Sequence, residues 1–427
     1  MPGNTRDDNA VAIMGPSRAF PPAVLHVDMG ESARTRRFLA RLIPTLARDP
    51  YCHPSAIVCP AHQLIERQAG RASVAVTRLV GPARGVASSV RAALLCRNAG
   101  RGIGTRVVHA HGPGSLRTAA TAARLLRAAL IASVYEVPSC APVKASGARR
   151  AARVLVPLDS FRGCVEAFFA RPVEVLPWGV DKRDLDGSPV PERVARELGL
   201  DPMTLHIGMT GDLSGPSSGG ETFVRAAVEA LSVIPFCDYV VIGSGDYVGY
   251  LEGLAHQLGV LGRFRFVPAS HGLARVLTTL SAVVFPGRPR SFPWELVEAA
   301  ACRTPIVASD CPEHREVLDG EVQVTWLAEG DVAGLAERFL KVLSRPGEAA
   351  PSTRRFLARR QRDSNELPLW ARPSPTGYDI SDGDLDEYDI IADDFSRRRA
   401  NVLRRFSFEA TVARLSELYA ELAGDRR

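Results

Sequence analysis

The chain of 427 residues is long enough for two domains of ordinary size, and its 46% hydrophobic and 23% charged residues exclude disorder over most of its length. Neither the first twenty residues nor any later stretch holds an apolar run of signal-peptide or membrane-spanning length, so we expect a cytoplasmic protein. Charge is divided unequally: residues 1–183 contain 26 Lys and Arg against 11 Asp and Glu, whereas residues 184–427 contain 27 against 36. The basic half favours an anionic partner, with solvated helix faces as the alternative.

Strand and helix patterns alternate along the first half of the chain. An apolar run at 23–28 is followed by Gly30 and an arginine-rich amphipathic stretch at 34–48, and helical spacing recurs at 116–130. Further short apolar runs lie at 55–59, 105–112, 130–134 and 153–158. Because these runs are apolar on both faces, they predict a doubly wound parallel sheet covered by helices.

A second alternation of the same kind begins near residue 205, after a polar, turn-rich stretch that predicts a linker. The pattern breaks again where eight of the sixteen residues from 379 to 394 are acidic, which predicts a disordered insertion. The predicted divisions are a flexible N-terminus at 1–22, a Rossmann-like domain at 23–183, a linker at 184–200, a second Rossmann-like domain at 201–345, the insertion at 346–395 and a terminal helix at 396–427.

Glycines follow several of the predicted strands. Gly30 ends the first strand, Gly211 follows the first strand of the second domain, and Gly243 and Gly245 end the run VVIGSG. In open parallel sheets, glycine turns at the carboxyl ends of strands let backbone N–H groups approach phosphates. One such turn is weak support, but two sets in two domains predict a nucleotide-binding cleft.

Three longer segments resemble glycosyltransferase family 4, whose members are retaining enzymes with the GT-B fold. They are FPGRPRSFPWELVEAAACRTPIVASDCPEHREVLDG at 285–320, VLPWGVD at 175–181 and RRFSFEATVARLSELY at 404–419. The resemblance covers about residues 23–345 and the final helix. It implies two Rossmann-like domains facing across a cleft, an acceptor-side N-terminal domain, a nucleotide-sugar C-terminal domain and a final helix that returns across the hinge.

The resemblance also assigns roles to individual residues. It makes Glu298 the acceptor of hydrogen bonds from the nucleotide ribose, and it places Glu316 at a later cleft glutamate. His111 matches a loop histidine that faces the donor sugar, so His111 and Glu298 are the predicted catalytic residues; His109 is expected to pack within the strand end. No metal or other cofactor is implied, and the absence of a C-x-x-C pair favours free thiols over a metal site.

Three positions depart from the family pattern. Arg290 stands where the family has a glutamate that binds sugar hydroxyls, Asp212 replaces an arginine that binds diphosphate, and Ser217 or Ser218 replaces a lysine. An aspartate beside a diphosphate is repulsive, by several kcal/mol in a partly desolvated cleft. Arginines at 288, 290 and 303 are the residues that could compensate, since guanidinium binds phosphate in a bidentate manner.

Two functions follow from these matches and departures. The first is transfer of a sugar from a nucleotide-diphosphate donor to a saccharide or lipid-linked acceptor, with retention. The second is a catalytically inactive GT-B protein that binds a ligand or partner. The arginine-rich helix starting at Arg34 suggests contact with an anionic membrane at the inner face, with packing against the sheet as the alternative. Nucleic-acid binding is disfavoured, because the basic half has no aromatic-interleaved basic motif.

Overall fold

The computed structural model describes residues 21–30, 33–48, 51, 53–79, 86–136, 148–185, 190–201, 204–268, 271–302, 304–318, 324–343 and 396–424. The chain forms two units. The first comprises Met1–Ala132, Ser146–Ala152 and Leu415–Arg427, and the second comprises Ser133–Ala145 and Arg153–Arg414. The predicted insertion at 346–395 and residues 1–20 of the predicted flexible N-terminus lie outside the described residues.

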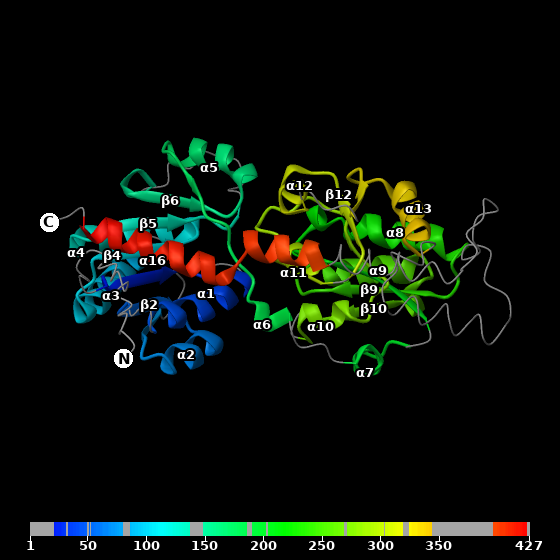
Figure 1. Ribbon diagram of the computed structural model, residues 1–427, viewed down its shortest axis with the longest axis horizontal. Helices are drawn as coiled ribbons and strands as arrows, with labels where there is room; N and C mark the ends of the chain where they lie inside the picture. The colour runs from blue at the N-terminus through cyan, green and yellow to red at the C-terminus, as the bar shows by residue number, and fades with distance from the viewer. Residues whose placement is uncertain are drawn as a thin grey trace, which may run out of the picture. The chain divides into compact units, whose positions relative to one another are not determined.

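A seven-stranded sheet forms from the first half of the sequence (Figure 1). Its strand order is β3-β2-β1-β4-β5-β6-β7. Its strands are β1 (Val24–Asp28), β2 (Ser55–Pro60), β3 (Ala75–Leu79), β4 (Val107–His111), β5 (Ala129–Ser133), β6 (Arg153–Val156) and β7 (Glu174–Val175). β1 pairs in parallel with both β2 and β4. Every residue of β1, β4 and β5 is buried, as expected for a parallel sheet covered on both faces.

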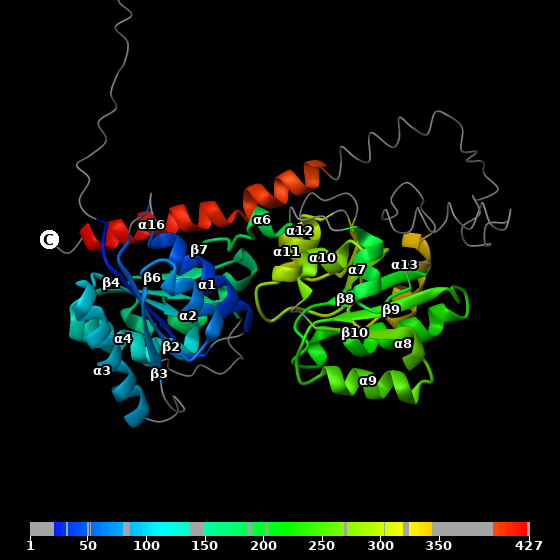
Figure 2. The ribbon, with the colours of Figure 1, turned by 90° about the horizontal axis from the view of Figure 1, so that it is seen from below.

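Helices follow the strands of this sheet. They are α1 (Ala33–Leu46), α2 (Gln63–Gly70), α3 (Val86–Ile103), α4 (Leu116–Leu126) and α5 (Arg162–Phe169), and α3 lies beside α4 (Figure 2). The helix predicted at 116–130 is shorter than expected, because Arg127 adopts a left-handed conformation with φ of 54° and β5 starts at Ala129. In α1, Phe38, Leu39, Leu42 and Ile43 are buried, so packing within the unit accounts for its apolar face.

The second sheet has six strands in the order β10-β9-β8-β11-β12-β13, and all five neighbouring pairs are parallel. Its strands are β8 (Leu205–Thr210), β9 (Cys237–Ile242), β10 (Phe264–Val267), β11 (Ala282–Phe285), β12 (Ile306–Ser309) and β13 (Val324–Leu327). The associated helices are α8 (Gly220–Leu231), α9 (Val248–Gln257), α10 (Leu273–Leu277), α11 (Trp294–Ala300), α12 (Pro312–Leu318) and α13 (Val332–Leu343). The central position of β8 and β11 brings the loops after them next to each other.

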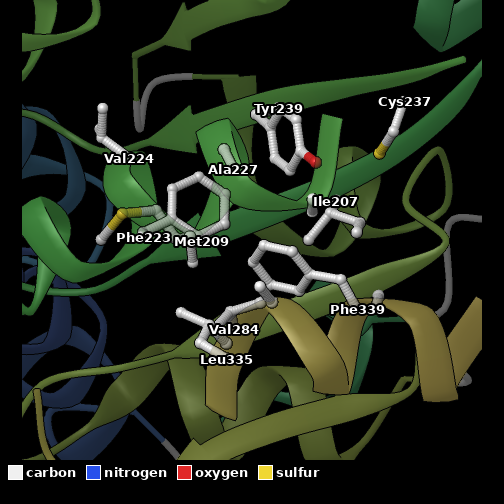
Figure 3. Packing of buried hydrophobic residues seen from close by; sticks show 14 of the residues in the cluster. Ile207, Met209, Phe223, Val224, Ala227, Cys237, Tyr239, Val284, Leu335 and Phe339 are labelled. Carbon is white, nitrogen blue, oxygen red and sulfur yellow. The ribbon is translucent and has the colours of Figure 1, made fainter. Parts of the chain in front are cut away.

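Three aromatic rings centre the core on one face of this second sheet. Figure 3 shows Phe223 of α8, Tyr239 of β9 and Phe339 of α13 within the cluster of buried residues. Phe223 meets Tyr239 edge to face with ring centroids 5.8 Å apart, and it meets Phe339 at 5.9 Å. This packing holds α8 and α13 against the sheet. The loop that follows β8 leads directly into α8.

The remaining described elements are short, apart from the last helix. α6 (Lys182–Leu185) begins just before the predicted linker at 184–200, and α7 (Pro191–Glu197) lies within it. The predicted linker is therefore partly helical. Residues 396–405 are helical, and α16 (Phe408–Gly424) follows them; the boundary between the two units falls within α16. Among the helices that the structure describes, none is long and apolar enough to cross a membrane.

Candidate functional site

The loops after β8, β9 and β11 contact one another at the carboxyl ends of their strands. A Cβ atom on Gly219 would lie 2.5 Å from the backbone nitrogen of Gly287, and a Cβ atom on Gly287 would lie 2.0 Å from the carbonyl oxygen of Ser217. Gly219 also has φ of +71°, in the left-handed region that favours glycine. The β8 and β11 loops are therefore packed backbone to backbone, and only glycine permits this.

The predicted glycines of the second domain belong to the same cluster of loops. A Cβ atom on Gly243 would lie 3.5 Å from the carbonyl oxygen of Gly211, and one on Gly245 would lie 2.3 Å from that of Leu213. The backbone nitrogen of Tyr247 donates to the Leu213 carbonyl at 3.1 Å, which ties the β9 loop to the β8 loop. The structure thus brings Gly211, Gly243 and Gly245 together, and their role in nucleotide binding stays a prediction.

The loop that leads from β8 to α8 contains two polar side chains of interest, Asp212 and Ser218. Asp212 is exposed, and its Oδ1 accepts a hydrogen bond from the backbone nitrogen of Ser214 at 3.0 Å. Ser218 Oγ accepts from the backbone nitrogen of Gly220, the first residue of the 12-residue helix α8. A helix N-terminus offers backbone donors and a positive dipole end to an anion, whereas the Asp212 carboxylate opposes one.

Glu298 and Arg290 lie on either side of the start of α11. Arg290 is exposed, and Glu298 is half-buried in the helix. Burial raises the pKa of the Cys302 thiol to about 12, and the negative charge of Glu298 adds to this rise. Glu298 is the fifth of the seven residues of α11.

A hydrogen-bond network ties the β11 loop to the segment after β12. Arg288 donates to the buried carboxylate of Glu313 at 3.1 Å, and Ser309 Oγ donates to the Gly287 carbonyl at 2.6 Å. His314 Nδ1 lies 3.0 Å from both Ser309 Oγ and the Ser309 carbonyl oxygen. Because a carbonyl only accepts, Nδ1 carries the ring proton of a neutral His314. Arg288 is thus bound within the protein, and Arg303 lies outside the described residues.

Acid should destabilise the second unit through His314. Burial lowers the pKa of His314 to about 4, against 6.5 in an unfolded chain. The unfolded state therefore binds the proton first, and the contribution of His314 to stability is lost as pH falls from 6.5 toward 4, by about 2 kcal/mol between pH 7 and pH 5. Urea unfolding at both values should show this loss in the wild type and a smaller one in His314→Leu. Equal losses in both proteins would contradict the assignment.

Glu316 makes hydrogen bonds with the chain's own backbone. One carboxylate oxygen accepts from the backbone nitrogen of Asp159 at 2.6 Å, and the other accepts from that of Ser160 at 2.8 Å. These donors belong to the short helical turn Asp159–Phe161 that leads into α5, so Glu316 caps that turn. To contact a ligand, as predicted, the Glu316 carboxylate would have to give up these two hydrogen bonds.

In the first unit, Ser115 connects the β1 and β4 strand ends. The backbone nitrogen of Met29 donates to Ser115 Oγ at 3.0 Å, and Ser115 Oγ donates to the His111 carbonyl at 2.6 Å. The backbone nitrogen of Gly30 donates to Asp28 Oδ1 at 3.1 Å. Gly30 thus forms the turn predicted after β1, and Ser115, which the sequence interpretation did not single out, holds that turn.

His111 lies inside the first unit, where its side chain has no solvent exposure. It is the last residue of β4, and its Nε2 is 3.0 Å from Nδ1 of His26 on β1. His109 is also buried, as expected, with Nδ1 2.7 Å from the hydroxyl of Tyr419 on α16. Because the His111 imidazole meets other histidines and no solvent, its role toward a donor sugar stays a prediction. His26 could have been noticed as the one polar residue within the strand run AVLHV.

Comparison with known proteins identifies the region that holds the glycine loops. Residues 204–345 match the family Glycosyl transferases group 1. The chain is 34% identical over 179 residues to a D-inositol 3-phosphate glycosyltransferase of Actinosynnema mirum, a match that covers 39% of this chain and 42% of that protein. The chain thus spans less than half the length of this curated relative.

Solved structures share the fold. A glycosyltransferase from Rickettsia africae ESF-5 is similar with a TM-score of 0.71 at 12% identity, covering 95% of this chain and 99% of that one. Anabaena Alr3699/HepE in complex with UDP and glucose is similar with a TM-score of 0.69 at 15% identity, covering 94% of this chain and 100% of that one. The predicted GT-B fold class, with two Rossmann-like parallel-sheet domains, is confirmed.

Proposed function

We propose that this protein is a retaining glycosyltransferase that moves a sugar from a nucleotide-diphosphate donor to a saccharide or lipid-linked acceptor. The observation that carries the proposal is the contact between the glycine loops after β8, β9 and β11 inside the segment that matches Glycosyl transferases group 1. The Anabaena protein of similar fold is described in complex with UDP and glucose, which supports a nucleotide-sugar donor.

The donor site follows from the placement of these loops. The loops after β8, β9 and β11 contain no lysine. The diphosphate would therefore be held by backbone N–H groups of the β8 loop and by the N-terminus of α8. Glu298 would accept hydrogen bonds from the ribose hydroxyls, and Arg290 would meet the sugar or the phosphates. Catalysis would come from positioning of the two substrates and from stabilisation of the leaving diphosphate, with no metal ion required in this step.

The acceptor is proposed from charge. Residues 1–183 are strongly basic, which suits a phosphorylated or lipid-linked acceptor and an anionic membrane surface. Because the apolar residues of α1 are buried, any contact of this helix with lipid would be made by its arginines, of which Arg37 is exposed. Such contact would weaken with added salt.

A second function is favoured by the same geometry, namely a catalytically inactive protein that keeps the GT-B fold for binding. Asp212 is exposed at the loop that would hold the diphosphate, Arg288 is paired with Glu313, and both carboxylate oxygens of Glu316 are bound to backbone. These features lower the number of groups available to a donor. They predict weak donor binding, whether or not turnover follows.

A donor screen distinguishes the two functions. Calorimetric titration with uridine, adenosine and guanosine diphosphate sugars should show that one donor binds. A second assay, which detects released nucleoside diphosphate, should show that this donor is hydrolysed slowly in the absence of an acceptor. Binding without release, even with candidate acceptors present, would favour the inactive protein. If no nucleotide sugar binds, the proposed function is overturned.

Replacement of Glu298 by alanine should weaken binding of that donor by about 10- to 100-fold. The expected loss is about 1.4–2.7 kcal/mol, which corresponds to one hydrogen bond to a charged acceptor at about 1.5–3 kcal/mol. Glu295→Ala is the matched control, because Glu295 lies on the same helix and is half-buried. If both variants bind the donor equally well, Glu298 has no role in the site.

Replacement of Asp212 by arginine should tighten binding of the nucleoside diphosphate by about tenfold, roughly 1.4 kcal/mol. The reason is that a repulsive carboxylate in the loop between β8 and α8 becomes an attractive guanidinium. Glu252→Arg, on the exposed side of α9, makes the same charge change and controls for a general electrostatic effect. Equal gains in both variants would show that Asp212 has no local effect on the diphosphate.

A further inference from the structure

Three histidines from two neighbouring strands meet inside the first unit. His26 on β1 is opposite His109 on β4, and His111 lies two residues further along β4, so all three point to one face of the sheet. One ring nitrogen from each lies within 4.8 Å of the other two. The rings of His109 and His111 are 4.1 Å apart between centroids, and none of the three side chains is exposed.

His26 contacts this cluster through one of its two ring nitrogens. His26 Nδ1 and His111 Nε2 are 3.0 Å apart, yet His26 Nε2 is buried and has no hydrogen-bond partner in the part of the chain that the structure describes. Burial lowers the pKa of each of the three imidazoles, and mutual repulsion adds to this for His26 and His111. A neutral imidazole is the form that binds a metal ion.

We propose that His26, His109 and His111 bind one divalent transition-metal ion, with Zn²⁺ as the first expectation. Imidazole nitrogen suits Zn²⁺, Cu²⁺, Ni²⁺ and Fe²⁺, and three histidines with one open position form a known type of zinc site. Two nitrogens bound to one ion at about 2.0–2.1 Å in a tetrahedral arrangement lie about 3.3 Å apart. Nδ1 of His26 and Nε2 of His111, 3.0 Å apart, are close to this distance, and Nε2 of His26 would keep the ring proton. The nitrogen of His109 lies within 4.8 Å of the other two and would have to move closer to bind the same ion.

Tyr419 supports the site from outside the set of ligands. Its hydroxyl lies 2.7 Å from His109 Nδ1, which fixes the ring orientation and leaves Nε2 as the other nitrogen of that ring. Metal-binding histidines generally make such a bond through the nitrogen that does not bind the metal. The bound ion would join β1 to β4 and, through His109 and Tyr419, to the part of α16 that belongs to the first unit.

His53 lies next to this cluster but differs from it in a useful way. Its ring meets Tyr419 edge to face at 5.5 Å, while Nδ1 is 3.0 Å from the Pro22 carbonyl and Nε2 is 2.6 Å from Ser416 Oγ. Both nitrogens of His53 are thus engaged in hydrogen bonds. His53→Gln removes a buried imidazole from the same region without removing a proposed ligand.

The test is metal binding by the full chain, purified without a histidine tag and stripped with a chelator. Titration with Co²⁺ should give visible absorption typical of a low-symmetry site that saturates at one equivalent, and added Zn²⁺ should displace it. His26→Asn, His109→Asn and His111→Asn should each weaken Zn²⁺ binding by at least about 100-fold. Tyr419→Phe should weaken it by about 10- to 100-fold, and His53→Gln should bind within threefold of the wild type.

Two results would overturn the proposal. One is the absence of a saturating equivalent of Co²⁺ or Zn²⁺ in folded wild-type protein, which would leave the cluster as a neutral hydrogen-bonded network. The other is unchanged binding in a His26→Asn/His111→Asn double variant, which would place the ion elsewhere. If the asparagine variants fail to fold by circular dichroism, Tyr419→Phe decides the matter, because it keeps all three ligands: unchanged affinity in that variant also contradicts the site.

Discussion

Alanine at position 287 should reduce donor binding by at least about 100-fold and lower the stability of the second unit by about 1–3 kcal/mol. The added Cβ atom would lie 2.0 Å from the Ser217 carbonyl oxygen and 2.4 Å from the carbonyl carbon of Ser218. Both are backbone atoms, so the β8 and β11 loops would have to separate, which is an overpacking cost. A displacement of about 1 Å in a binding site is enough for a 100-fold loss.

Gly253→Ala is the matched control for this substitution. Gly253 is exposed on α9, and a Cβ atom there would meet nothing within 4 Å. Alanine in a helix should stabilise the protein by about 0.5–1 kcal/mol and leave donor affinity unchanged. Calorimetry and urea unfolding of both variants measure the two effects; donor affinity in Gly287→Ala equal to that of the wild type would show that the loop contact does not position the donor.

Phe339→Ala should lower the free energy of unfolding of the second unit by about 3–5 kcal/mol. Phe339 is fully buried, and its ring contacts both Phe223 and Tyr239, with centroids 5.9 Å and 5.8 Å away. Truncation removes apolar contacts and leaves a cavity that rigid neighbours from α8 and β9 cannot fill. Because α8 follows the β8 loop directly, donor affinity should fall together with stability.

Urea unfolding measures this loss, with Lys341→Ala as the control on the same helix. Lys341 is exposed, so its replacement should change stability by no more than about 0.5 kcal/mol. A loss below about 1 kcal/mol for Phe339→Ala would mean that the aromatic cluster does not hold α13 against the sheet.

Local patterns in the sequence were sufficient to predict the fold. Apolar runs such as LHIGMT and CDYVVI are buried at every residue, and the intervening amphipathic stretches are helices, because both periodicities are written in consecutive residues. The glycines at 211, 243 and 245 were placed correctly at strand ends for the same reason. A glycine turn, a strand and a helix each depend on residues that are close together in the sequence.

The partners of the predicted site residues needed the tertiary structure. Arg288 is paired with Glu313, 25 residues away, and Glu316 binds backbone nitrogens more than 150 residues away. A charged residue in a loop has the same appearance in the sequence whether it faces a ligand or a buried carboxylate. The sequence therefore identified the residue types at the site but not which of them are already engaged.

The histidine cluster shows the same division most clearly. The sequence by itself indicated that His109 packs within a strand end and that His111 lies in the loop after it, and His26 stands in the apolar run AVLHV. Only the tertiary structure decided that they meet, because strand order brings β1 beside β4 across 85 residues of chain and the register aligns His26 with His109. Periodicity is a local property of a chain, whereas the pairing of distant strands depends on the packing of the whole sheet.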